Sequence, residues 1–249
     1  EVYLTGLPRS AADHVTNSIE FRKNPEFDPD SPDAGPEYLL YLTQGSNTGV
    51  GGVDSAWANR PERLLSATVL EIDPSRTPPE GGFDVTTEPL PEDQTRFRDD
   101  DNNLKDDPIS MGDGRYLVFD ERGVASVQDV DGNVLSTFYD PFAEDAVAKI
   151  FATGIRNAYD LVWHSDGRLY VPTNGGAAGG VVPDDPATPQ DESLISVGLQ
   201  EDYLFTVDQG GYYGHGNPLR DEYILDGGNP TRFDDANEVS TYAPGTQPD

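Results

Sequence analysis

The chain has 249 residues, enough to bury a substantial core in one or two domains. Its 46 acidic and 16 basic residues give a formal net charge of -30, which excludes nucleic acid and anionic lipid as expected partners because both would be repelled. The absence of cysteine excludes disulfides, thiolate catalysis and Cys-ligated zinc.

Short apolar runs bounded by Gly, Pro, Asn and Asp predict β-strands along the chain. In order, these strands are residues 1–7, 18–21, 38–43, 67–72, 116–119, 125–129, 134–138, 161–163, 169–171 and 203–207. Residues 22–36 are rich in Asp and Pro and predict an enlarged hairpin loop. Residues 74–108 have few apolar side chains and predict a surface insertion. Residues 143–151 predict a short helix.

This pattern predicts an all-β fold over residues 1–249, as a single domain or a fragment of one. A loose recurrence of an apolar run, a small polar turn and Leu-Tyr favours radial repetition of four-stranded blades, which is typical of a β-propeller. A β-sandwich is the alternative fold.

The stretch 152–175 is the most informative part of the sequence. Two apolar runs within it are joined by Ser165, Asp166 and Gly167, and Asp-Gly between alternating residues predicts a hairpin. Just upstream, Arg156 and Asn157 place a planar cation and an amide where a loop enters the strand. Polar groups at such a position are how all-β folds usually build sites.

Three ordered motifs carry a resemblance to a known family. They are Asp13-His14 in the loop before residues 18–21, the sequence Gly154-Ile155-Arg156-Asn157 with the hairpin after it, and residues 210–218, which read GGYYGHGNP. With these motifs the chain resembles the soluble quinoprotein sugar dehydrogenases, also called the glucose/sorbosone dehydrogenase family. The resemblance spans residues 2–218 and is interrupted by the acidic insertions.

The resemblance implies a six-bladed β-propeller that uses pyrroloquinoline quinone (PQQ) and calcium to oxidise the anomeric carbon of a sugar to a lactone. Its partners would be a small-molecule sugar and an electron acceptor. Because the motifs correspond to the middle blades of that ring, we expect an incomplete propeller, with further blades outside these residues.

The resemblance assigns roles to four residues. His14 corresponds to the general base, a task suited to a side chain that exchanges a proton near neutrality, and Asp13 would orient it. Arg156 and Asn157 correspond to cofactor-binding residues, since a guanidinium offers forked donors to quinone and carboxylate oxygens. The alternatives are a surface histidine and an arginine that only ties down a loop.

Three further positions are candidates for calcium. Asn174, Gly175 and Gly176 are the nearest matches to the backbone carbonyls that bind the ion in the family, although the Gly-Pro step of the family is not reproduced. His215 replaces the usual Trp of its turn, while His164 reads as structural. These departures favour the alternative function, a non-catalytic extracellular propeller module for glycan binding or for surface or filament assembly.

The expected location is extracellular or extracytoplasmic. No apolar run approaches the roughly 18 residues of a membrane helix, so membrane insertion is not expected. The sequence has no signal-peptide pattern and no evident closing element, which suggests a mature part of a larger secreted chain. An acidic, lysine-poor surface suits concentrated salt and predicts a halophilic or marine source, with a generic acidic secreted protein as the alternative.

Overall fold

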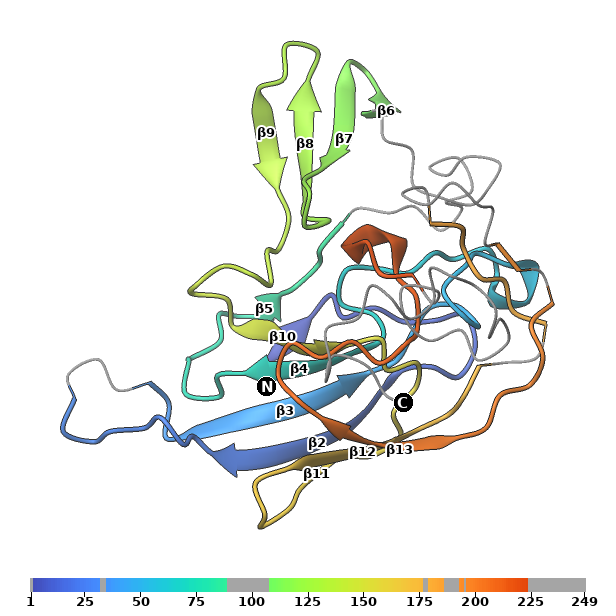
Figure 1. Ribbon diagram of the computed structural model, residues 1–249. Helices are drawn as coiled ribbons and strands as arrows, with labels where there is room; N and C mark the ends of the chain where they lie inside the picture. The colour runs from blue at the N-terminus through green and yellow to red at the C-terminus, as the bar shows by residue number, and fades with distance from the viewer. Residues whose placement is uncertain are drawn as a thin grey trace.

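The computed structural model describes residues 2–31, 35–88, 108–176, 179–185, 193–194 and 196–223 (Figure 1). Regular structure within these ranges consists of β-strands and of two short 3-10 helices, η1 (Ser55–Trp57) and η3 (Pro218–Arg220). The prediction of an all-β fold is therefore confirmed for this part of the chain. None of the helices described here has the length and apolar character needed to cross a membrane.

The described strands form open sheets (Figure 1). The central sheet is antiparallel, in the order β10-β4-β3-β2, and comprises β2 (Thr16–Lys23), β3 (Tyr38–Gln44), β4 (Thr68–Ile72) and β10 (Ala148–Thr153). A second antiparallel sheet comprises β11 (Val162–Trp163), β12 (Leu169–Thr173) and β13 (Tyr203–Val207). A third projects away from these two in Figure 1 and comprises β6 (Ile109–Gly112), β7 (Arg115–Phe119), β8 (Ala125–Asp129) and β9 (Val134–Thr137). The remaining pair, β1 (Leu4–Thr5) and β5 (Phe83–Asp84), is parallel.

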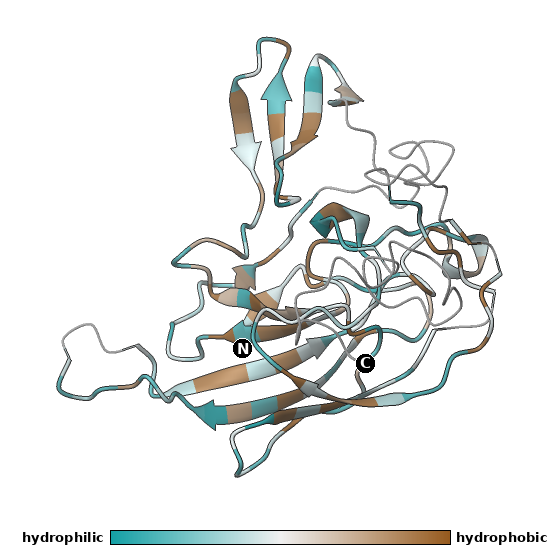
Figure 2. Cartoon of the chain, viewed as in Figure 1, coloured by the Kyte–Doolittle hydropathy of each residue, from teal (hydrophilic) through white to brown (hydrophobic). Residues whose placement is uncertain are grey.

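The central sheet is covered on both faces because its inner strands carry apolar side chains on both faces. On one face, Leu42, Leu70 and Ile72 pack with Val85, which follows β5. On the other face, Tyr41 and Val69 pack against β12 and β13. At the sheet edge, hydrophobic and hydrophilic residues instead alternate along β2 (Figure 2). The core thus lies on the two sides of β3 and β4, the inner strands of the sheet.

The predicted strands at residues 18–21 and 38–43 are confirmed as the pair β2–β3, and the predicted hairpin at 161–171 is confirmed as β11–β12. The predicted helix at 143–151 is wrong, because residues 148–153 form strand β10 alongside β4. Ile150 and Phe151 of this strand contribute to different core clusters, so packing on both faces of the sheet overrides the local helical preference.

The segment 74–108, predicted to be a surface insertion, is described only in part. Residues 89–107 lie outside the described ranges. Before them, Phe83 and Asp84 pair with β1, and Val85, Thr87 and Glu88 are buried. The adjacent strands β4 and β10 are therefore separated in sequence by residues 73–147, which include β5 and the whole third sheet.

Replacing Leu70 by Ala should lower the free energy of unfolding by about 2–5 kcal/mol, because it leaves a cavity in the core beside β3. Urea unfolding followed by tryptophan fluorescence measures the loss. Leu204→Ala is the matched control, since Leu204 is 67% exposed whereas Leu70 is fully buried. Equal losses in the two variants would contradict this description of the core.

Candidate functional site

The loop that follows β3, residues 45–53, is buried throughout. It begins at Gly45, where a Cβ atom would lie 2.9 Å from His14 Cβ and 3.0 Å from Asn157 Oδ1. Only glycine therefore leaves room for these two residues on either side of the loop. The close approach brings two of the predicted site residues, which are far apart in sequence, to the same end of the central sheet.

His14 and Arg156 both contact Ser46. The Ser46 hydroxyl lies 2.8 Å from His14 Nδ1, and the Ser46 backbone N–H donates to the Arg156 carbonyl at 2.7 Å. The Trp57 ring lies beside both side chains, with its centroid 4.4 Å from that of the His14 ring and 5.7 Å from Arg156 Cζ. The predicted base and the predicted cofactor-binding arginine are thus neighbours.

The hydrogen bonds of Ser46 define the tautomer of His14. The Ser46 hydroxyl also lies 2.9 Å from the Thr48 carbonyl oxygen, which can only accept a hydrogen bond. Both bonds form when the hydroxyl donates to Thr48 and accepts from the protonated Nδ1 of His14. This arrangement leaves the lone pair on His14 Nε2, which is the atom that a general base needs.

Burial weakens His14 as a base. The imidazole is 2% exposed, and desolvation, followed by the electrostatic influence of Arg156 and His215, lowers its pKa to about 3. The opposing influence of Asp13 is smaller, because its exposed carboxylate lies 4.0 Å from His14 Nε2. The ring is therefore neutral at neutral pH, and it is covered.

Arg156 is 9% exposed, and its Nε donates to the Gly49 carbonyl at 2.7 Å. This bond ties down the loop 45–53, as the alternative reading of this residue anticipates. Among the described residues its two Nη groups have no hydrogen-bond acceptor within the chain. Desolvation lowers the pKa of Arg156 to about 10, so the guanidinium still carries its charge at neutral pH. Its Nη donors are available to an anion.

Asn157 is held in a chain of three amides. Its Oδ1 accepts from Asn17 Nδ2 at 3.0 Å, and its Nδ2 donates to Asn174 Oδ1 at 3.0 Å. Its backbone N–H donates to the Thr173 hydroxyl at the end of β12. Asn157 therefore joins the central sheet to the second sheet, and its amide is largely occupied by this task.

The predicted calcium ligands follow β12 directly. The Gly176 carbonyl accepts from the Gln200 N–H at 3.3 Å, and the Asn174 carbonyl accepts from the Thr173 hydroxyl at 3.4 Å. No group of three or more His, Asp or Glu able to hold a metal ion occurs in the described ranges. Because calcium takes six to eight oxygen ligands, this set of residues does not by itself fit the ion.

Sequence reasoning missed Glu62, the most heavily hydrogen-bonded residue beside the loop. Its fully buried carboxylate accepts from the backbone N–H groups of Asn47 and Thr48 and contacts the hydroxyl of Ser66. His215 Nε2 donates to it at 2.9 Å. Burial alone would raise the pKa of Glu62, but His215 and these hydrogen bonds outweigh it and lower the value to about 2. No motif in the sequence marks Glu62.

The comparisons with known proteins leave the family open. No protein-family model matches the chain, and neither a curated protein nor a solved structure matches it significantly. Function is therefore inferred from the residues of the chain itself.

Glu62→Gln should destabilise the protein by about 3–5 kcal/mol, because the amide cannot accept at both ends and His215 loses its buried partner. Chemical denaturation at neutral pH measures the change. Glu121→Gln, in the exposed β7–β8 turn, serves as the control. A loss of less than about 0.5 kcal/mol in Glu62→Gln would show that this carboxylate does not hold the loop.

The pKa of His14, lowered from 6.5 to about 3, makes stability depend on pH. The unfolded chain binds this proton as the pH falls below about 6.5, whereas the folded chain does not. The contribution of neutral His14 to the free energy of unfolding is therefore fully present above about pH 6.5 and is lost as the pH decreases. Between pH 7 and pH 5 the wild type should lose about 2 kcal/mol more than His14→Gln. Denaturant titrations at both pH values test this, with His164→Gln, on the exposed hairpin, as the control. Equal losses in wild type and His14→Gln would refute the lowered pKa.

Proposed function

We propose that this chain is the sugar-oxidising part of a secreted, PQQ-dependent aldose dehydrogenase. One observation carries the proposal. His14 and Arg156, two residues singled out by separate motifs, meet at Ser46, which bonds the imidazole of one and the backbone carbonyl of the other. Their partners in the proposed reaction are an aldose and an electron acceptor.

In the proposed reaction, the cyclic aldose loses the proton of its anomeric hydroxyl and a hydride from the same carbon. His14 Nε2 carries the free lone pair and would take the proton, while the anomeric C–O bond becomes the lactone carbonyl. PQQ, when bound, would supply the two-electron acceptor for the hydride. Because His14 is covered, the sugar reaches Nε2 only when neighbouring groups such as Trp57 move aside.

The chemistry of Arg156 fits a PQQ-binding role. Its buried guanidinium has two free Nη groups among the described residues, and PQQ carries carboxylates that such a fork can bind. Asn157 would act indirectly by positioning Asn174 and the adjacent backbone. Calcium remains a prediction of the family resemblance alone, since the residues present do not form a complete set of ligands.

We further propose that the central and second sheets are neighbouring blades of a propeller. The last strand of the central sheet, β10, is followed along the chain by β11 of the second sheet. Each is an antiparallel sheet, and they pack against one another through Tyr41, Val69 and β12. Stacked antiparallel sheets that follow one another in this way are what radial repetition produces.

A second candidate is a non-catalytic glycan-binding or assembly module. The burial of His14 and its lowered pKa favour this function, because a base whose pKa lies so far below neutral pH has little driving force to take a proton. The engagement of both ends of the Asn157 amide within the chain points the same way.

Dye-linked oxidation of glucose and related aldoses in concentrated salt distinguishes the two functions. The protein should turn over when PQQ and calcium are added, and His14→Gln should lower kcat by about a hundred- to ten-thousandfold. The matched control is His164→Gln, because this exposed histidine on the β11–β12 hairpin is far from Ser46 in the fold and should leave kcat unchanged.

Two results would overturn the dehydrogenase proposal. One is the absence of both turnover and PQQ binding, measured as a change in the PQQ absorbance, by a protein that unfolds cooperatively. The other is turnover that His14→Gln leaves unaltered. The first result would favour the binding module.

A further inference from the structure

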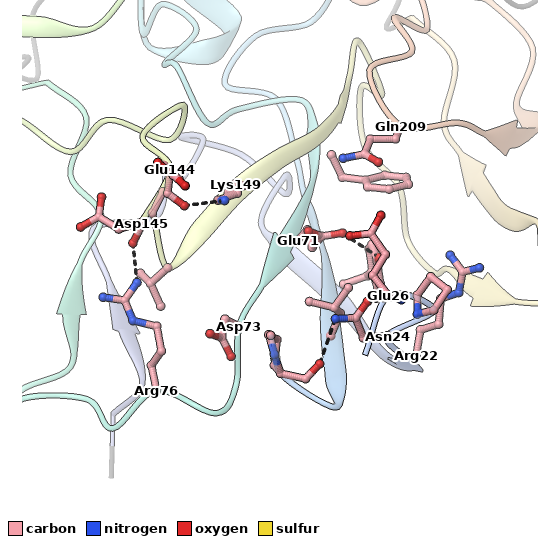
Figure 3. A pocket seen from close by; sticks show the side chains of 18 residues that line it. Arg22, Asn24, Glu26, Glu71, Asp73, Arg76, Glu144, Asp145, Lys149 and Gln209 are labelled. Atoms are coloured by element: carbon pink, nitrogen blue, oxygen red, sulfur yellow. Dashed lines mark hydrogen bonds between the residues drawn. The ribbon is translucent and has the colours of Figure 1, made fainter. Parts of the chain in front are cut away.

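A pocket of ≈ 580 Å³ is lined by residues of β2, β3, β4 and β10, with Arg22, Glu71 and Lys149 among the side chains around it (Figure 3). It lies at the opposite end of the central sheet from His14 and Arg156. Strand β3 runs between the two places, since Leu39 and Tyr41 line the pocket whereas Gln44 leads into the loop 45–53. Gln209, which follows β13, also contributes to the wall. The pocket therefore lies where the central sheet and the second sheet part.

The inner wall of the pocket is aromatic and rigid. Tyr41 and Phe151 meet edge to face with ring centroids 5.1 Å apart, and both are buried in the core. The Tyr41 hydroxyl donates to Glu71 Oε2 at 2.8 Å and so fixes that carboxylate at the pocket wall. Burial and the bond to Glu71 raise the pKa of Tyr41, which keeps it a donor.

The three cationic side chains that line the pocket are also held in place. Arg22 lies over the Trp163 ring, with its Cζ 3.7 Å from the centroid. Arg76 Nη1 donates to the Asp145 carbonyl at 2.6 Å, and Lys149 Nζ donates to the Glu144 carbonyl at 2.7 Å. Each cation uses only part of its donor capacity in these contacts, so further N–H groups remain for a ligand.

The same pocket is lined by five carboxylates, those of Glu26, Glu71, Asp73, Glu144 and Asp145. Five negative and three positive groups around one pocket give no strong field of a single sign, so neither a simple anion nor a simple cation is favoured. What the wall supplies is a close mixture of strong acceptors and strong donors. This mixture matches a ligand whose hydroxyl groups each donate and accept.

We propose that this pocket is a binding site for a small saccharide, distinct from the proposed oxidation site. Its volume lies within the range of about 300–1,000 Å³ that small-molecule sites occupy. Glu71 accepts from sugar hydroxyls, and Lys149 donates to them. The site shares none of these residues with the cluster around Ser46, so it does not depend on the proposed dehydrogenase function.

Isothermal titration of the whole chain with maltotriose, cellotriose and chitotriose tests the site. At least one trisaccharide should bind with a Kd of about 1 mM or tighter. Glu71→Gln and Lys149→Met should each weaken that binding about tenfold or more, whereas Glu121→Gln, away from the pocket, should not. Using two pocket variants keeps the test valid if one of them fails to fold.

His14→Gln separates this proposal from the preceding one, because it should lower the kcat of sugar oxidation and leave trisaccharide affinity unchanged. The saccharide site is overturned if none of the three sugars binds, or if binding persists unaltered in both pocket variants. It is also overturned if spermidine binds in the pocket and the sugars do not, since the carboxylates would then select a cation.

Discussion

The buried carboxylate of Glu62 is the interaction on which the candidate site depends. Removing a carboxylate from water costs several kcal/mol, and donors from Asn47, Thr48 and His215 offset that cost here. Because two of these donors are backbone N–H groups of the loop 45–53, the charge fixes the course of a loop that has no regular structure. That loop presents Ser46, and the positions of His14 and Arg156 follow from it. A single charged group thus organises residues with which it forms no hydrogen bond.

The packing of two sheets determines where sites can form. The central sheet and the second sheet share one core through Tyr41, Val69 and Val171, so the middle of their contact is apolar. Among the described residues, polar side chains gather where the sheets part, at the loop end beyond Gln44 and at the pocket beside Leu39. Each end draws on residues from both sheets. At one end Asn157 links Asn17 of β2 to Thr173 of β12, and at the other Arg22 of β2 lies over the Trp163 ring of β11. The packed interface between the two sheets therefore fixes the positions of these polar side chains.

The sequence predicted what local pattern controls and missed what tertiary contacts control. The β2–β3 pair and the β11–β12 hairpin follow from alternation and turn residues, which act over a few positions. Strand β10 was missed because its pairing with β4 spans the whole third sheet and overrides its local helical pattern. The meeting of His14 with Arg156 could be anticipated only from ordered motifs. Glu62 and Trp57 had no such signal, since each acts through neighbours that are distant in sequence.

The tension between burial and catalysis at His14 has a physical resolution within the proposed function. After desolvation, the charge of Arg156 is the largest cause of the lowered pKa. An anion bound to the free Nη groups of Arg156 would cancel much of that charge and make the imidazolium less costly. An anionic cofactor would therefore strengthen the base as it binds. Under the proposed function, His14 would thus be a weak base in the unliganded chain and a stronger one beside an anion held by Arg156.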